Sequence, residues 1–248
     1  MKIGNICSSI IVTGLLCTAN SLAMEKSHWG YTGQISPEHW GKLDARFAAC
    51  SSGKNQSPIN LTAMIEGELA PITINYKAEA NEILNNGHTI QVNCKTGSSI
   101  SVSGRTFELK QFHFHSPSEN TIEGQSFPLE AHFVHADKDG NFAVIAVMYK
   151  EGKENAELDK AWAYMPANAD EQSSLPVSID ANLLLPQNQD YYRFNGSLTT
   201  PPCTEGVWWF VMKSSNTVSK DQIEKFTNAM RHPNNRPVQP VNARMILQ

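Results

Sequence analysis

Three histidines constrain this chain more than any other feature of its sequence: His113 and His115, and then His132. The segment Gln111–His115 alternates in the manner of a β-strand, so residues 111, 113 and 115 would share one face. On such a strand the Cβ atoms of His113 and His115 stand about 6.6 Å apart. This separation lets both imidazoles tilt toward one ion, which takes nitrogen ligands at about 2.0–2.1 Å.

A second strand-like segment, Leu129–Val134, brings Glu130 and His132 to one face in the same way. If the two strands are neighbours, His132 completes a site of three neutral imidazoles with an open fourth position, which is typical of catalytic zinc. Ligating imidazoles usually donate their second N–H to an oxygen atom. Gln111 and Glu130, each two residues before a histidine, are placed to accept such bonds. A lone His-x-His pair more often lies at the surface or packs in the interior without binding a metal. The third histidine, with its own carboxylate, favours a metal site.

Seven segments that include these histidines resemble the α-class carbonic anhydrases, in the order and at the intervals of that family. They are His28–Tyr31, Asn55–Leu61, Asn85–His88, Glu108–Asn120, Glu130–His135, Ser197–Cys203 and Arg236–Pro240. Each segment alone is weak evidence, but together they are specific and cover nearly the whole mature chain. The resemblance implies one catalytic domain over residues 24–248. Its fold would be mainly β (α+β), with a large twisted, mostly antiparallel central sheet, a few short peripheral helices and the metal at the bottom of a conical cleft.

The resemblance also implies an activity and a cofactor. The cofactor would be Zn²⁺, and the reaction would be the reversible hydration of CO2 to bicarbonate and a proton, by attack of zinc-bound hydroxide on CO2. In this family the hydroxyl matching Thr199 accepts a hydrogen bond from the hydroxide and donates one to the carboxylate matching Glu119, which can only accept when it is ionised. The positions that contact CO2 or bicarbonate match Val134, Val144, Leu198, Thr200 and Trp209.

Proton export is a further implication of the resemblance. His88 matches the proton shuttle of the family, and its ordinary pKa of about 6.5 suits proton transfer at neutral pH. Tyr31, Asn86 and Gln91 match residues that hold the connecting waters. Without the resemblance, His88 would be interpreted as a surface residue of the Asn-Gly turn. The other histidines, for which we predict only surface or packing roles, are His28, His39, His135 and His232.

The first 23 residues have the features of a signal peptide. Lys2 supplies a positive charge, Ile6–Leu16 is a short apolar segment, and Ser21 and Ala23 are small residues before a cleavage site. The apolar segment is too short to span a bilayer. We therefore predict a periplasmic or secreted protein, cleaved near Ala23, without a membrane span. The net charge of −4 and the lack of a basic run argue against a nucleic-acid partner.

Three cysteines remain after removal of the predicted signal peptide: Cys50, Cys94 and Cys203. The sequence alone does not choose among the three pairs that they allow. The resemblance implies a disulfide between Cys50 and Cys203, as in many secreted α-class enzymes, in an oxidising compartment. Cys94 stands where relatives often carry an aromatic residue, and we expect it to be a buried, inert thiol.

Local patterns predict the elements around the site. Alternating runs predict strands over residues 72–76, 89–93, 99–103, 107–115, 129–135, 142–149 and 207–213. A first helix is expected to begin with Pro37 and to carry Trp40. Asn155 is a candidate N-cap for a second helix. Ser219 and Gln222 form a capping box for a third.

Two other functions compete with this prediction. A cupin would also carry His113, His115 and Glu119 in its first motif and would bind iron or manganese, but the residues after His132 do not fit its second motif. A silent carbonic-anhydrase-like binding module would typically lack a ligand histidine, whereas this chain keeps all three. The resemblance further implies inhibition by sulfonamides and small anions. The oligomeric state is not fixed by the sequence, and a homodimer is compatible with it.

Overall fold

The computed structural model describes Met1, residues 28–77 and residues 80–248. The predicted signal peptide therefore lies, apart from Met1, outside the described residues. Among those residues, no helix is both long enough and apolar enough to cross a membrane.

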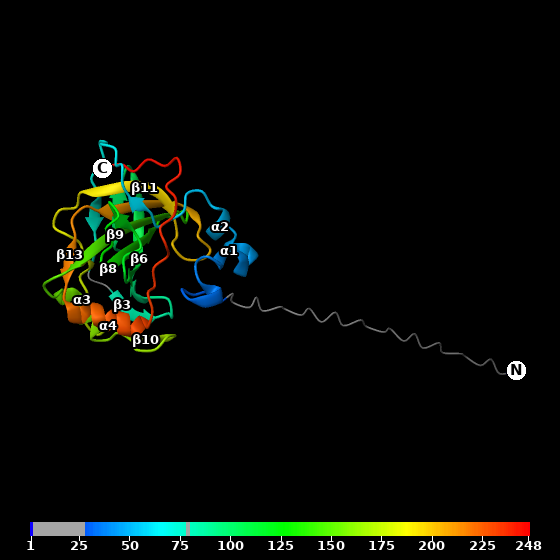
Figure 1. Ribbon diagram of the computed structural model, residues 1–248. Helices are drawn as coiled ribbons and strands as arrows, with labels where there is room; N and C mark the ends of the chain where they lie inside the picture. Colours follow the sequence, from blue (N-terminus) through cyan, green and yellow to red (C-terminus); the bar gives the residue numbers. More distant parts are fainter. Residues whose placement is uncertain (2–27, 78–79) are drawn as a thin grey trace.

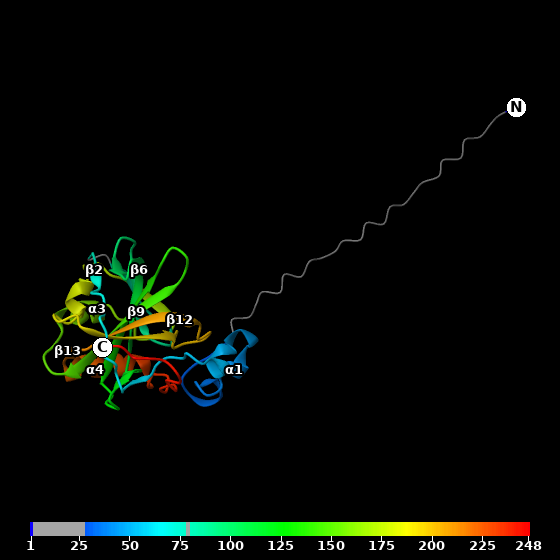
Figure 2. The same ribbon diagram turned by 90° about the horizontal axis from the view of Figure 1, so that it is seen from above.

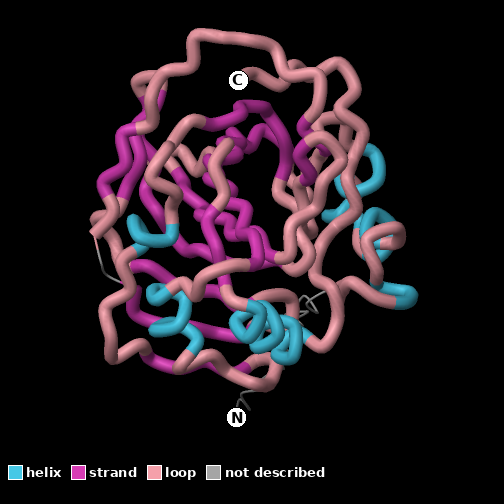
Figure 3. The backbone as a smooth tube through the Cα atoms, turned by 60° about the vertical axis from the view of Figure 1, so that its left-hand side comes forward, coloured by secondary structure: helices cyan, strands magenta, loops and turns pink. Residues whose placement is uncertain are grey.

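One large sheet forms the centre of the molecule, and the helices lie at its periphery (Figures 1 and 3). Its strands run in the order β10-β3-β4-β6-β8-β9-β12-β11, and β2, β5 and β13 pair beside this path. Their bounds are β2 Thr73–Asn75, β3 Ala80–Asn85, β4 Ile90–Cys94, β5 Ser99–Val102, β6 Arg105–His115, β8 Leu129–Ala136, β9 Phe142–Glu151, β10 Glu171–Ser174, β11 Tyr191–Ser197, β12 Glu205–Met212 and β13 Asn216–Val218. A small separate pair joins β1 Asn60–Leu61 to β7 Thr121–Ile122.

Most neighbouring strands of the large sheet are antiparallel, and the pairs of β9 with β12 and with β13 are parallel. The fold class expected from the sequence is therefore confirmed. All seven predicted strands are present with small shifts of their ends. The strands β1, β3, β7, β10, β11 and β13 were not predicted.

Strand β9 is buried on both faces because each face of the sheet carries its own hydrophobic core. Its side chains divide between the two cores, with Ala143, Ile145, Val147 and Tyr149 in one and Val144, Ala146 and Met148 in the other. The first core is closed by α3 Ala156–Trp162 and α4 Lys220–Met230, whose Trp162 and Phe226 rings stack with centroids 6.2 Å apart. Each large apolar side chain buried here contributes about 1.5–3 kcal/mol.

The helices α3 and α4 begin where the sequence predicts. The Asn155 side chain accepts hydrogen bonds from the backbone N–H groups of Glu157 and Leu158, and Ser219 with Gln222 forms a complete capping box. The Gln222 side chain also bonds to both backbone groups of Asn155, at 2.9 and 2.8 Å. The N-terminal ends of the two helices are therefore held together.

The predicted start of the first helix, at Pro37, is wrong. Residues 37–39 form turns, and the helical segments that follow are short: α1 Trp40–Leu43, η2 Ala45–Phe47 and α2 Ala49–Ser52. The Trp40 indole N–H bonds to the carbonyls of Gly30 and Ile35. These bonds hold the segment against the short 3-10 helix η1 Gly33–Ile35. The backbone is extended at Asp44, whose side chain caps η2 by accepting from the Arg46 N–H, so a continuous helix does not form. Seen from above, this region lies on the opposite side of the sheet from α3 and α4 (Figure 2).

Cys50, in α2, is bonded to Cys203, which confirms the expected disulfide. Cys94 is unpaired and partly buried, and burial raises the pKa of its thiol to about 12. A thiol with this pKa is almost entirely protonated at neutral pH, so Cys94 is a poor nucleophile.

Candidate metal centre

The three histidines predicted to bind metal lie together at the centre of the sheet. Strands β6 and β8 are antiparallel neighbours, and His113 lies directly opposite His132 in their register. One nitrogen from each of His113, His115 and His132 lies within 4.8 Å of the other two. His115 and His132 are each only 1% exposed, whereas His113 is half-buried and faces the cleft.

The second ring nitrogen of each histidine has an oxygen partner. Gln111 Oε1 lies 2.8 Å from His113 Nδ1, and Glu130 Oε1 lies 2.9 Å from His132 Nε2. The partner of His115 Nδ1, at 2.7 Å, is the backbone carbonyl of Asn234. These contacts leave Nε2 of His113, Nε2 of His115 and Nδ1 of His132 free to face a common point.

Glu130 is itself fixed by three hydrogen bonds. Its carboxylate accepts from the backbone N–H groups of Glu119 and Asn120, at 2.6 and 2.9 Å, and from the Asn120 side chain at 2.7 Å. Burial raises the pKa of Glu130, and the bonds from Asn120 and Glu119 oppose this shift. An anchored carboxylate of this kind holds the His132 ring in one orientation.

The histidine cluster suits a cation. Burial lowers the pKa of all three imidazoles, and for His113 and His132 the nearby histidines lower it further. All three are therefore neutral at neutral pH, as metal ligands must be. Within the part of the chain that the structure describes, His115 Nε2 is buried without a hydrogen-bond partner. Three neutral nitrogens, one of them buried without a partner, fit the ligand set of catalytic zinc.

Glu119 lies beside this cluster. Its Oε2 atom is 3.5 Å from His115 Nε2 and 3.9 Å from His132 Nδ1, and its Oε1 atom accepts from the backbone N–H of Arg236 at 2.8 Å. Burial raises the pKa of Glu119 well above its usual range, while hydrogen bonding from Arg236 and from the Thr199 hydroxyl opposes this shift. Thr199 therefore lies next to Glu119, the neighbour that the family resemblance implies for it.

An apolar wall adjoins the histidines. Val134 on β8 is opposite Val144 on β9, and Val144 is paired with Trp209 on β12. Leu198 packs into the same core, and the Trp209 ring lies 4.9 Å from the His132 ring between centroids. The structure thus brings together four of the predicted substrate contacts, while the fifth, Thr200, lines the cavity in front of His113.

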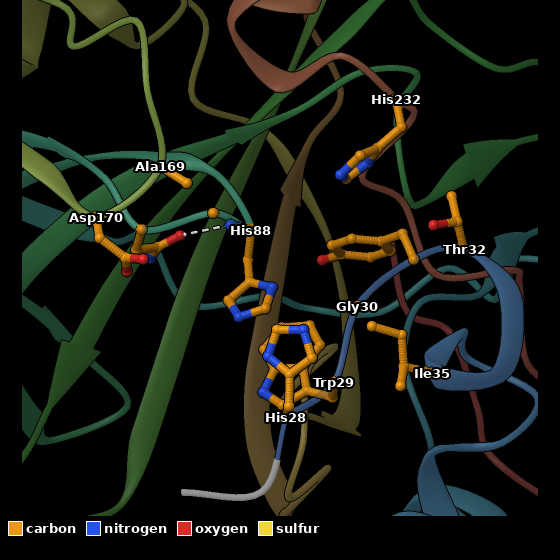
Figure 4. Close-up of a pocket in the computed structure, with 12 residues that line it drawn as sticks. His28, Trp29, Gly30, Thr32, Ile35, His88, Ala169, Asp170 and His232 are labelled. Atoms are coloured by element: carbon orange, nitrogen blue, oxygen red, sulfur yellow. Dashed lines mark hydrogen bonds between the residues drawn. The ribbon is translucent and has the colours of Figure 1, made fainter.

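Two cavities lie in front of the histidines. The inner one, of about 120 Å³, is lined by Thr89, Gln91, Gln111, His113, His115 and Thr200, together with residues that it shares with the outer cavity. The outer one, of about 410 Å³, opens toward solvent and is drawn in Figure 4. The residues that line both are Trp29, Tyr31, Asn86 and His88.

His88 therefore lies between the inner site and the surface, and its ring stacks on Trp29 with centroids 3.7 Å apart. The Asn86 side chain accepts from the backbone N–H groups of His88 and Thr89 and so fixes this turn. The Gln91 amide donates to Asn93 at 2.7 Å. His28 and His232, for which we predicted only surface or packing roles, also line the outer cavity (Figure 4).

The chain is similar over most of its length to known carbonic anhydrases. The family model of eukaryotic-type carbonic anhydrases matches residues 35–248. A carbonic anhydrase of Neisseria gonorrhoeae is 52% identical over 237 residues, which cover 94% of each chain. A carbonic anhydrase of Klebsiella pneumoniae is 48% identical and covers 90% of this chain and 91% of its own. The chain belongs to the α-carbonic anhydrase family. Membership implies an enzyme, a lyase, with zinc-dependent CO2 hydration as its chemistry, and it excludes the cupin alternative.

Solved structures agree with this assignment. The α-carbonic anhydrase of Thermovibrio ammonificans, in complex with the inhibitor sulfanilamide, is 50% identical, with a TM-score of 0.89 over 90% of this chain and 100% of that chain. A dioscorin complexed with ascorbate is also similar, at 33% identity and a TM-score of 0.82 over 89% of this chain and 97% of that chain.

Proposed function

We propose that this chain catalyses the reversible hydration of CO2 to bicarbonate and a proton, with one zinc ion held by His113, His115 and His132. The observation that carries the proposal is the convergence of three neutral imidazole nitrogens beside an apolar wall. Zinc bound there would lower the pKa of a water molecule to about 7, the value characteristic of carbonic anhydrases, and so supply a nucleophile at neutral pH.

Thr199 and Glu119 would orient this nucleophile. An ionised Glu119 can only accept a hydrogen bond, so the Thr199 hydroxyl must donate its hydrogen to Glu119. Toward the nucleophile, the same hydroxyl can then act only as a hydrogen-bond acceptor. This directs the lone pair of the nucleophile toward the substrate. The Arg236 backbone N–H, at 2.8 Å from Oε1, stabilises the ionised carboxylate against the effect of burial.

The apolar wall would receive CO2, which has no hydrogen-bond donor. Val144 and Trp209 belong to the core on that side of the sheet, and the partly buried Val134 and Leu198 pack against it. Val144 is central, since it pairs with both Val134 and Trp209. A bulkier residue at Val144 would therefore obstruct the substrate most directly. Thr200, in the inner cavity, would contact CO2 or bicarbonate.

His88 would transfer the product proton to solvent. It lines both cavities and does not belong to the histidine cluster, which supports a role in carrying the proton between the inner cavity and solvent. Tyr31, Asn86 and Gln91 line the inner cavity with it and would hold the intervening waters. We further propose that residues 1–23 direct export to the periplasm or medium, and that sulfonamides and small anions inhibit the enzyme.

Metal analysis with ligand variants tests the proposal. We expect one zinc per chain in the wild type, and a strong loss of both zinc and CO2 hydration in His132→Ala, because two imidazoles hold zinc poorly in a catalytic geometry. His39→Ala, which changes a histidine outside the cluster, should keep both. Full zinc occupancy and activity in His132→Ala would refute the ligand assignment.

A further inference from the structure

The guanidinium of Arg236, which the proposed reaction does not use, is a buried cation near Glu119. Arg236 is 1% exposed. Its guanidinium donates from Nη1 to Gln56 Oε1 at 2.9 Å and to the Ser57 carbonyl at 2.7 Å, and from Nη2 to the Cys50 carbonyl at 2.9 Å. The planar fork of arginine suits three acceptors of this kind, which a lysine ammonium cannot reach together in the same geometry.

Two residues that accept from this guanidinium, Gln56 and Ser57, also form hydrogen bonds with the segment that carries Thr199. The Gln56 amide donates to the Cys203 carbonyl at 3.0 Å. Ser57 and Ser197 exchange hydrogen bonds, from the Ser57 N–H to Ser197 Oγ at 2.9 Å and from the Ser197 N–H to Ser57 Oγ at 3.1 Å. Arg236 therefore connects to both ends of the 197–203 segment through buried polar contacts.

The backbone of the same residue holds Glu119. The Arg236 N–H donates to Oε1 at 2.8 Å, while Oε2 of the same carboxylate lies 3.5 Å from His115 Nε2. The two oxygens of a carboxylate move together, so the position of this N–H determines where Oε2 lies. The side chain of Arg236 is anchored by its guanidinium, whose three acceptors are all buried or backbone groups.

We propose that Arg236 is a positioning residue. Its side chain fixes its own backbone N–H, and through it the orientation of Glu119 toward Thr199 and the metal nitrogens. This inference rests on the proposed function, in which Glu119 orients the nucleophile. A purely structural clamp would lower stability alone, whereas a positioning residue also lowers the rate per correctly folded, zinc-loaded site, and does so only while Glu119 is present.

A double-mutant cycle distinguishes the two roles. We would measure kcat/KM for CO2 hydration per site, with sites counted by titration with a tight-binding sulfonamide and zinc measured in each protein. The variants are Arg236→Lys, Glu119→Gln and the double variant. Arg236→Lys should lower kcat/KM about 10-fold, at the low end of the loss that outer partners of metal sites cause. In the Glu119→Gln background the same substitution should change kcat/KM by less than about twofold, the usual error of additivity.

Arg244→Lys is the matched control. Arg244, like Arg236, donates to three acceptors, here the backbone carbonyls of Asn195, Pro240 and Val241, but none of its hydrogen bonds goes to Glu119. It should lower the melting temperature and leave kcat/KM within about twofold. If Arg236→Lys does not fold, Gln56→Met replaces it, since it removes one acceptor of the guanidinium and leaves Arg236 in place.

Three outcomes would overturn the inference. One is an unchanged kcat/KM in Arg236→Lys or Gln56→Met, and another is an equal loss with and without the Glu119 carboxylate. Both would leave the proposed function intact, because Glu119→Gln alone would still be impaired. An unimpaired Glu119→Gln enzyme would instead refute the role of Glu119 and the inference with it.

Discussion

Burial determines the chemistry of the individual side chains around the metal centre. Burial lowers the pKa values of His113, His115 and His132 and so favours neutral imidazoles, whereas it raises the pKa values of Glu119 and Glu130, a shift that hydrogen bonds to both carboxyls oppose. The sequence predicted Gln111 and Glu130 as imidazole partners because both share a strand face with a histidine. It could not predict the third partner, the Asn234 carbonyl, because a backbone group has no signature in the sequence.

At this scale we predict that His88→Ala separates the two halves of the catalytic cycle. Steady-state turnover in dilute buffer should fall about 10-fold or more, because a positioned proton acceptor is lost. The value of kcat/KM for CO2 should stay nearly unchanged, since it reports steps that precede proton export. Added imidazole should restore turnover in a stopped-flow assay. An equal loss in both parameters, without rescue by imidazole, would mean that His88 is structural.

At the scale of secondary structure, the central strands were predictable and the outer ones were not. Strands β6 and β8 alternate clearly because one face carries the histidines and the other face packs in the core. Strand β10 is polar and mostly exposed, so its own sequence has no alternating apolar pattern. It is a strand because it pairs with β3, and this pairing could not be predicted from the segment itself. In β11, a register shift at Gly196 interrupts the alternation at the edge of the sheet.

His135 ties β8 to Tyr76, just beyond the end of β2, and gives a prediction at this scale. Its Nδ1–H donates to the Ala143 carbonyl, so Nε2 accepts from the Tyr76 hydroxyl at 2.7 Å, and burial lowers the pKa of His135 to about 3. In the unfolded chain this pKa is about 6.5. Below that pH the unfolded form gains a proton that the folded form does not, so the free energy of unfolding decreases as pH falls.

From pH 6.5 to pH 5 this group should remove about 2 kcal/mol of stability. Urea denaturation of the zinc-loaded protein at several pH values would measure the loss. The His135→Gln variant should be less stable at pH 7 but should show a smaller decrease over the same interval. The same decrease in both proteins would show that His135 does not titrate as its burial requires.

At the scale of the whole molecule, the site is assembled from segments far apart in the chain. Its histidines and two of their partners, Gln111 and Glu130, come from the middle of the sequence, and its apolar wall comes from three strands and Leu198. The Asn234 carbonyl and the Arg236 N–H come from the C-terminal part of the chain. Spacing and alternation predicted the histidine cluster, whereas the pocket and the disulfide required the family resemblance. The contacts of Arg236 depend on long-range packing, which neither source predicted.

The disulfide is the covalent link at this scale. Cys50 and Cys203 are 153 residues apart, and closing a loop of this length contributes about 5 kcal/mol in the chain-entropy description. The Cys50→Ser/Cys203→Ser variant should therefore melt on the order of 10 °C lower in calorimetry. Cys94→Ser, as a control, should not show a loss of that size. A melting temperature that does not respond to loss of the bridge would contradict this account.

The most direct measurement is stopped-flow CO2 hydration by the mature chain, before and after zinc is removed by a chelator and then restored. We predict hydration far above the rate in buffer, loss of activity with the metal and full recovery at one zinc per chain, with inhibition by a sulfonamide. Hydration that persists after complete removal of zinc would contradict the account, as would its absence at full zinc occupancy.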